Sequence, residues 1–275
     1  MASVTQRISQ IIQPSGGYLK PSEFEKIQLN DGKELGEENV HAGVIGMTVD
    51  YLTRYIKDRE AHPEKRYEYS LFESFYISIE GYKIKMKLVD PKEIKMDEKN
   101  GVEIMQLLSR IKGLDDESII AAVKATTYDV WLRNTSFAFT SKGAVDTNPD
   151  KTTINNIRIF VERSLEFWKK YGPITVDGFT FEKDGYTATV DSGDGDYLTK
   201  DTLWDFKVSK SAPTNKHTLQ LLMYWIMGKH SKKKEFKDIT KIGIFNPRLN
   251  TVYLYDLNKL SVDIIKDIED NVICY

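Results

Sequence analysis

The sequence predicts an α/β protein with a mostly helical first section and a second section that mixes strands and helices. Apolar residues at helical spacing dominate residues 1–149, whereas residues 150–275 alternate helix-like segments with short aromatic and β-branched runs. A chain of 275 residues can hold one large domain or two small ones. The polar segment 141–152 contains glycine and proline, so we expect a loop or hinge there.

The first section is expected to be an accessory section with no catalytic motif. Residues 1–40 contain several prolines and glycines and are expected to be loosely structured. Four later segments have helical spacing, and acidic residues suited to a helix N-terminus precede the last one. These expected helices cover 43–57, 67–79, 105–111 and 119–131. The section would shape substrate access, or bind a protein partner or a second copy of the chain.

In the second section, a helix is followed by strands, a second helix, two more strands and a closing helix. The helices are predicted at 154–170, 214–227 and 261–269, with Gly228 as a natural stop for the middle one. Strands are predicted at 178–182, 186–190, 196–199, 202–208, 242–245 and 251–255.

Two aspartates are expected to face each other in a hairpin of this section. If the turn is centred on Lys200-Asp201, Asp196 lies opposite Asp205, with Cβ atoms roughly 5 Å apart. Lys207 then shares the face of Asp205. Because opposed like charges repel, the pair predicts a metal ion between the carboxylates. The alternative is a polar hairpin edge whose charges resist aggregation.

This prediction depends on the register of the hairpin. A slip of one residue would move Asp196 off the face of Asp205 and remove the site. Trp204 and Phe206 alternate with the acid and should lie on the opposite, covered face of the strand.

Three short motifs occur in order on a strand, the next strand and a helix. They are Gly193-Asp-Gly-Asp196, Asp205-Phe-Lys207 and Gln220-Leu-Leu-Met-Tyr224. This order resembles the PD-(D/E)xK nuclease superfamily, and within it the branch of the RecB nuclease domain and the Cas4-like proteins. The resemblance covers about residues 150–258 and implies a restriction-endonuclease-like core, a mixed central sheet flanked by helices.

The resemblance implies a Mg²⁺-dependent nuclease that hydrolyses DNA phosphodiester bonds with an activated water, with Mn²⁺ as a substitute for Mg²⁺. Asp196 and Asp205 would bind the metal, and the backbone carbonyl of Phe206 would add a third ligand. Lys207 would orient the water or offset charge in the transition state. Gln220 would help to position the site.

Four more residues are candidates for supporting the site or contacting nucleic acid. Tyr224 follows Gln220 by one helical turn and otherwise borders the core of the helix. Glu162 would be the additional acid that related nucleases carry on the preceding helix, or else a solvated charge. Asp194 is a turn-former or supports the site, and Arg248 contacts a phosphate or pairs with a surface acid.

The remaining charged residues have less specific interpretations. His217 is expected to be an exposed helix residue. The lysines between 229 and 241 form either a solvated loop or a phosphate-contacting edge beside the site, which would make binding salt-sensitive.

Composition narrows the class of protein. The net charge of −2 does not suit a protein that coats polyanions without specificity. Cys274 is the single cysteine, so a disulfide framework, a cysteine zinc site and the iron–sulfur cluster of Cas4-like proteins are not expected. With neither a bilayer-spanning apolar stretch nor a secretion signal, no membrane association and a cytoplasmic location are the default expectations.

A second class of function remains open. A protein on the same fold can lose catalysis and use the site to bind DNA or a protein, as a phage or defence-system accessory protein would. The intact Asp196, Asp205 and Lys207 favour the enzyme.

Overall fold

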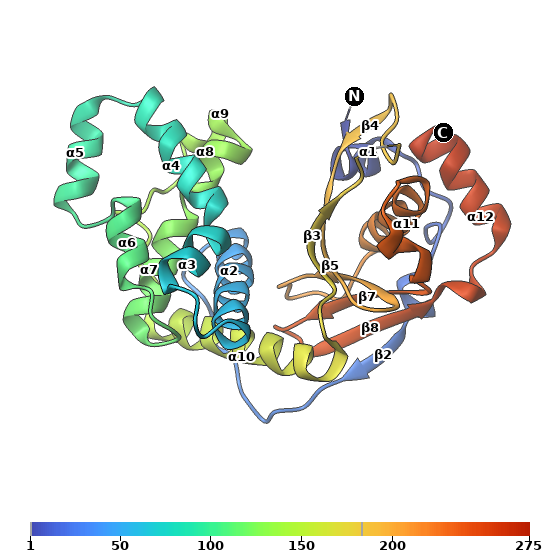
Figure 1. Ribbon diagram of the computed structural model, residues 1–275, viewed down its shortest axis with the longest axis horizontal. Coiled ribbons are helices and arrows are strands. Elements are labelled where there is room, and N and C mark those ends of the chain that lie inside the picture. Colours follow the sequence, from blue (N-terminus) through green and yellow to red (C-terminus); the bar gives the residue numbers. More distant parts are fainter. Residues whose placement is uncertain (1, 183) are drawn as a thin grey trace. The chain divides into compact units, whose positions relative to one another are not determined.

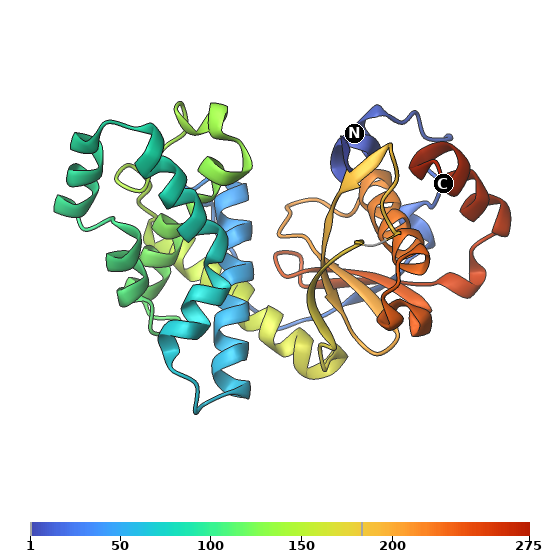
Figure 2. The same ribbon diagram turned by 45° about the horizontal axis from the view of Figure 1, so that its top comes forward.

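In the computed structural model, which describes residues 2–182 and 184–275, the chain forms two compact units (Figures 1 and 2). One unit is Gly32–Glu166, and the other combines residues 2–31 with Phe167–Tyr275. The division therefore differs from the expected boundary at 149/150. Residues 2–31 join the C-terminal unit because the backbone of β2 (Glu25–Gln28) pairs with that of β8 (Thr251–Asp256).

The C-terminal unit is built on a mixed sheet, as expected for the α/β class. Six strands of the described residues lie in the order β2-β8-β7-β6-β5-β3. The other four are β3 (Val176–Thr180), β5 (Asp194–Leu198), β6 (Thr202–Phe206) and β7 (Lys241–Asn246). Among the described strands of this sheet, only β6 and β7 pair in parallel. Helix α11 (Asn215–His230) makes the crossover that such a parallel pair requires.

The strand expected at 186–190 is not part of this sheet. Residues 186–189 instead lie in a turn in which the Thr187 N–H donates to the Val190 carbonyl at 3.0 Å. Strand β4 (Val190–Ser192) begins there and pairs in parallel with β1 (Ala2–Ser3). The meander is consequently β3-β5-β6.

Besides α11, the C-terminal unit contains helices near its first and its last residues. Helix α1 (Val4–Gln10) follows β1, and α12 (Val262–Asp267) continues into a π-helix at Ile268–Ile273. Gly228 does not stop α11. A Cβ at that position would lie 2.0 Å from the ring of Phe236, so the glycine permits close packing rather than a helix end.

Two hydrophobic clusters pack on the sheet. Leu198 and Leu203 belong to the cluster that contains the apolar residues of α11. Trp204 belongs to an aromatic cluster with Phe167 and Trp168 from the end of α10 (Lys151–Tyr171). Neighbouring residues of β6 therefore alternate between the two clusters, as the period of a strand requires.

The other unit, Gly32–Glu166, is helical. Its helices are α2 (Ala42–Ala61), α3 (Tyr67–Ser74), α4 (Tyr76–Leu88), α5 (Pro91–Lys99), α6 (Ile104–Arg110), α7 (Asp116–Thr126), α8 (Asp129–Arg133), α9 (Thr135–Ala138) and most of α10. The helix expected at 67–79 is two helices, and the one expected at 119–131 is α7 followed by α8. No helix among the described residues is both long and apolar enough to cross a membrane.

Candidate metal-dependent active site

The hairpin β5–β6 has the register that the sequence predicts. Leu198 pairs with Leu203, and Tyr197 pairs with Trp204. Continued by one residue, this register sets Asp196 opposite Asp205. At that point a side-chain hydrogen bond takes the place of the backbone hydrogen bonds between β5 and β6. The N–H of Phe206 donates to Asp196 Oδ2 at 2.8 Å.

The side chains of β6 also face as expected. Phe206 stacks on Trp168 with ring centroids 5.1 Å apart, and Trp204 meets Phe167 edge to face at 4.9 Å. These contacts hold one face of the strand in the aromatic cluster. Asp205 lies between the two residues in sequence, so its side chain is directed to the opposite face.

Asp205 is a buried carboxylate with one unsatisfied oxygen. It is 3% exposed, and Lys207 Nζ donates to its Oδ1 at 3.0 Å. Its Oδ2 is buried and has no hydrogen-bond partner. Leaving a buried charged oxygen unpaired is costly, and in a native protein such an atom calls for an explanation, such as a bound ion.

Lys207 forms an ion pair with this carboxylate. Burial lowers the pKa of its amine, but the charges of Asp205 and Asp196 and the hydrogen bond to Asp205 outweigh it, so the pKa is raised overall. Lys207 is therefore an ammonium at neutral pH. It carries positive charge at the site and has no lone pair to act as a base.

Helix α11 brings a buried polar pair to the same side of the sheet. Gln220 Nε2 donates to the hydroxyl of Tyr224 at 2.8 Å. Burial raises the pKa of Tyr224, the hydrogen bond from Gln220 opposes this, and the charges of Asp205 and Asp196 raise it further. Tyr224 is therefore a neutral phenol, able to donate a hydrogen bond.

His217 is half-buried rather than exposed as expected. Its Nδ1 accepts a hydrogen bond from the N–H of Thr214 at 3.1 Å, which leaves the proton of the neutral ring on Nε2. Burial and the charge of Lys207 lower the pKa of His217, while the charge of Asp205 raises it. The Thr-x-x-His spacing, which matches that of a capping box, is the signal that could have revealed this role.

Three other candidates lie in different surroundings. Asp194 begins β5, is exposed, and adds to the negative field at Lys207. Arg248 lies in the β7–β8 turn and is only 7% exposed, with its N–H donating to Asn246 Oδ1 at 3.0 Å. Glu162 belongs to the helical unit, where it pairs with Lys33.

Lys241, the last lysine of the lysine-rich segment, lies away from the two aspartates. Lys241 pairs in register with Thr202, the first residue of β6, and its amine contacts Asp201 at 2.8 Å. Thr202 precedes Asp205 by three strand residues, or about 10 Å. The segment thus joins the sheet at the turn end of the hairpin, which does not support a phosphate-contacting edge at the site.

The carboxylate oxygens of Asp196 and Asp205 are of the kind that a magnesium ion prefers. The described part of the chain contains no group of three or more His, Cys, Asp or Glu side chains arranged for a metal. Magnesium prefers oxygen ligands and keeps several waters, so two carboxylates are sufficient. The unpartnered oxygen of Asp205 is the feature that such an ion would satisfy.

Comparison with known proteins found no matching family model, no matching curated protein and no matching solved structure.

Proposed function

We propose that the chain is a metal-dependent nuclease that hydrolyses DNA phosphodiester bonds on a restriction-endonuclease-like core. The observation that carries this proposal is the buried Asp205, with one unpartnered oxygen, set opposite Asp196 by the register of the hairpin. The antiparallel meander β3-β5-β6, followed by α11 and the parallel strand β7, supports the same fold.

Asp196 and Asp205 would hold Mg²⁺ or Mn²⁺, and the carbonyl of Phe206 is a suitable third ligand. In an antiparallel ladder the N–H and C=O of one residue point to the same neighbouring strand. Since the Phe206 N–H points to Asp196, its carbonyl is expected on the same side. When bound, the metal would neutralise phosphate charge and lower the pKa of a water molecule.

The other residues of the site act on the substrate's charge and position. Lys207 presents a fixed positive charge, which would stabilise the negative charge that grows on the phosphate during hydrolysis. The hydrogen bond from Gln220 orients the Tyr224 hydroxyl, which can then donate to a phosphate oxygen or to a water.

The direct test is hydrolysis of linear, circular and single-stranded DNA in Mg²⁺, Mn²⁺ or EDTA. We expect cleavage only with the metals, and a loss of about 100- to 1,000-fold in Asp205→Ala and in Lys207→Ala. Asp191→Asn, at an exposed position of β4, is the matched control and should cleave normally. Cleavage that persists in Asp205→Ala would contradict the mechanism.

A second measurement separates metal binding from catalysis. A ligand that binds only the folded state raises its stability. Mn²⁺ should therefore raise the melting temperature of the wild type and of Asp191→Asn, but not that of Asp205→Asn.

The alternative is a catalytically inactive module on the same fold that binds nucleic acid or a protein. Metal-dependent stabilisation and DNA binding without any cleavage would identify this alternative.

A further inference from the structure

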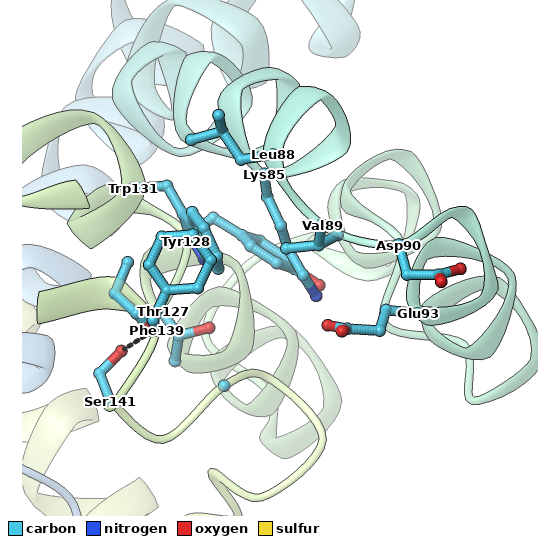
Figure 3. Close-up of a pocket in the computed structure, with 12 residues that line it drawn as sticks. Lys85, Leu88, Val89, Asp90, Glu93, Thr127, Tyr128, Trp131, Phe139 and Ser141 are labelled. Atoms are coloured by element: carbon cyan, nitrogen blue, oxygen red, sulfur yellow. Dashed lines mark hydrogen bonds between the residues drawn. The ribbon is translucent and has the colours of Figure 1, made fainter. Parts of the chain in front are cut away.

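The helical unit contains a pocket of about 360 Å³ that no residue of the candidate site lines (Figure 3). Its lining comes from the end of α4, the start of α5, the α7–α8 junction, α8 itself, and the end of α9 with the residues after it. The residues that matter for its chemistry are Lys85, Leu88, Asp90, Glu93, Trp131 and Phe139.

Two aromatic rings form adjacent walls of this pocket. Trp131 and Phe139 meet with ring centroids 4.9 Å apart and planes at 73°. Phe139 is 61% exposed and Leu88 is 51% exposed, so apolar surface at the pocket is left in contact with water. An occupant that covers these side chains would gain the free energy of burying them.

The pocket has a net negative charge, because among the described residues its lysine is paired and its two acids, Asp90 and Glu93, are not. Lys85 is already neutralised, because it pairs with the buried Asp97 and lies over the Tyr128 ring, 5.4 Å from its centroid. Asp90 caps α5 by accepting from the Lys92 N–H at 2.8 Å. In the part of the chain that the structure describes, neither Asp90 nor Glu93 forms an ion pair.

We propose that this pocket binds an organic cation, an alkylammonium or guanidinium group attached to an apolar body. Aromatic faces attract such cations, and carboxylates make charge-assisted hydrogen bonds to them. An anion would be repelled by Asp90 and Glu93, and a hydrated metal ion would gain nothing from Trp131 and Phe139. The proposal does not depend on nuclease activity.

Titration of the full chain with tetramethylammonium, spermidine and N-acetylarginine amide tests the proposal. Because Trp131 lines the pocket, binding should change tryptophan fluorescence in a saturable way, and the change should vanish in Trp131→Phe. The neutral tert-butanol, similar in size to tetramethylammonium, should not produce it. Tighter binding of spermidine would indicate a free polyamine, and tighter binding of the arginine amide would indicate a protein side chain.

Two pairs of variants localise the binding. Phe139→Ala and Glu93→Gln should each weaken it by about fivefold. Phe137→Ala, an equally exposed ring on α9, and Glu98→Gln, an exposed acid on α5, lie outside the pocket lining and should bind normally. Phe139 and Glu93 are both exposed, so their variants should fold, which thermal unfolding would verify.

Three results would overturn the proposal. They are the absence of saturable binding by any of the cations, unchanged affinity in both Phe139→Ala and Glu93→Gln, and binding of tert-butanol as tight as that of tetramethylammonium.

Discussion

At the scale of single residues, the helical unit contains a carboxylate whose ionisation opposes folding. Asp129 is fully buried and accepts hydrogen bonds from the hydroxyls of Tyr51 and Ser78, each at 2.5 Å. Burial raises the pKa of Asp129 by more than these hydrogen bonds and Arg133 lower it. The folded state therefore holds this proton at a pH where the unfolded state has released it.

This shift predicts a loss of stability as the pH rises. Above the unfolded pKa, about 3.9, the folded state binds more protons than the unfolded state. The free energy of unfolding should consequently fall as the pH rises, and the fall should end once the pH exceeds the pKa of Asp129 in the folded state. Asp129→Asn should flatten this part of the profile, as measured by urea unfolding between pH 4 and 8. An unchanged slope in Asp129→Asn would contradict the assignment.

Local sequence information was sufficient to predict the register of the β5–β6 hairpin, which sets Asp196 opposite Asp205. Aromatic and β-branched residues on both sides of Lys200-Asp201 define the hairpin, and its alternation separates Asp205 from Trp204. The unpartnered oxygen of Asp205 could not be predicted, because it depends on what packs around the side chain. The same is true of Glu162, whose membership of the helical unit follows from long-range packing.

At the scale of elements, His217 stabilises the start of α11. Its Nδ1 accepts a hydrogen bond from the N–H of Thr214. This N–H is one of the backbone donors at a helix start that have no intrahelical partner. His217→Ala should lower the free energy of unfolding by about 1 kcal/mol, the usual value of one hydrogen bond. Glutamine is a normal residue at this position of a capping box, so His217→Gln should retain most of the stability. Equal destabilisation in urea by both substitutions would exclude the capping role.

The pairing of β3 with β5 depends on a glycine next to the acidic pair. Gly195 pairs with Phe179, and a Cβ at Gly195 would lie 2.0 Å from the Phe179 ring. Gly195→Ala should destabilise the C-terminal unit by about 1–3 kcal/mol through overpacking. Chemical denaturation would measure this, with Gly113→Ala as the control, since a Cβ there meets nothing within 4 Å.

A double mutant tests whether contact with the Phe179 ring causes the destabilisation by Gly195→Ala. Phe179→Leu removes part of the ring, so Gly195→Ala should cost less in that background than in the wild type. Full additivity would show that the destabilisation has another origin.

At the scale of the whole molecule, the sequence predicted the α/β class but not which residues form the C-terminal unit. Strands β5 to β8 have strong local patterns, whereas β2 is short and polar and is defined only by its pairing with β8, more than 220 residues later. Helix α5 was also missed because it is mostly exposed, although Asp90-Pro91 is a normal helix start.

The N-terminal segment is therefore expected to be essential for the C-terminal unit. Val4, Ile8, Leu19 and Phe24 are all buried in the same cluster as the apolar residues of α11, and the Thr218 hydroxyl donates to the Leu19 carbonyl at 2.6 Å. Burying four such side chains contributes about 6–12 kcal/mol. This is comparable with the total stability of a domain, about 5–15 kcal/mol.

A chain without residues 2–31 should lose the C-terminal unit and keep the helical one. Calorimetry should show the unfolding transition of the helical unit alone, and the proposed DNA cleavage should be lost. Asp129→Asn identifies that transition, because it should shift the transition of the helical unit and leave the other in place. Persistence of both transitions after deletion would show that β2 and α1 are dispensable, and that the C-terminal unit folds from residues after 166.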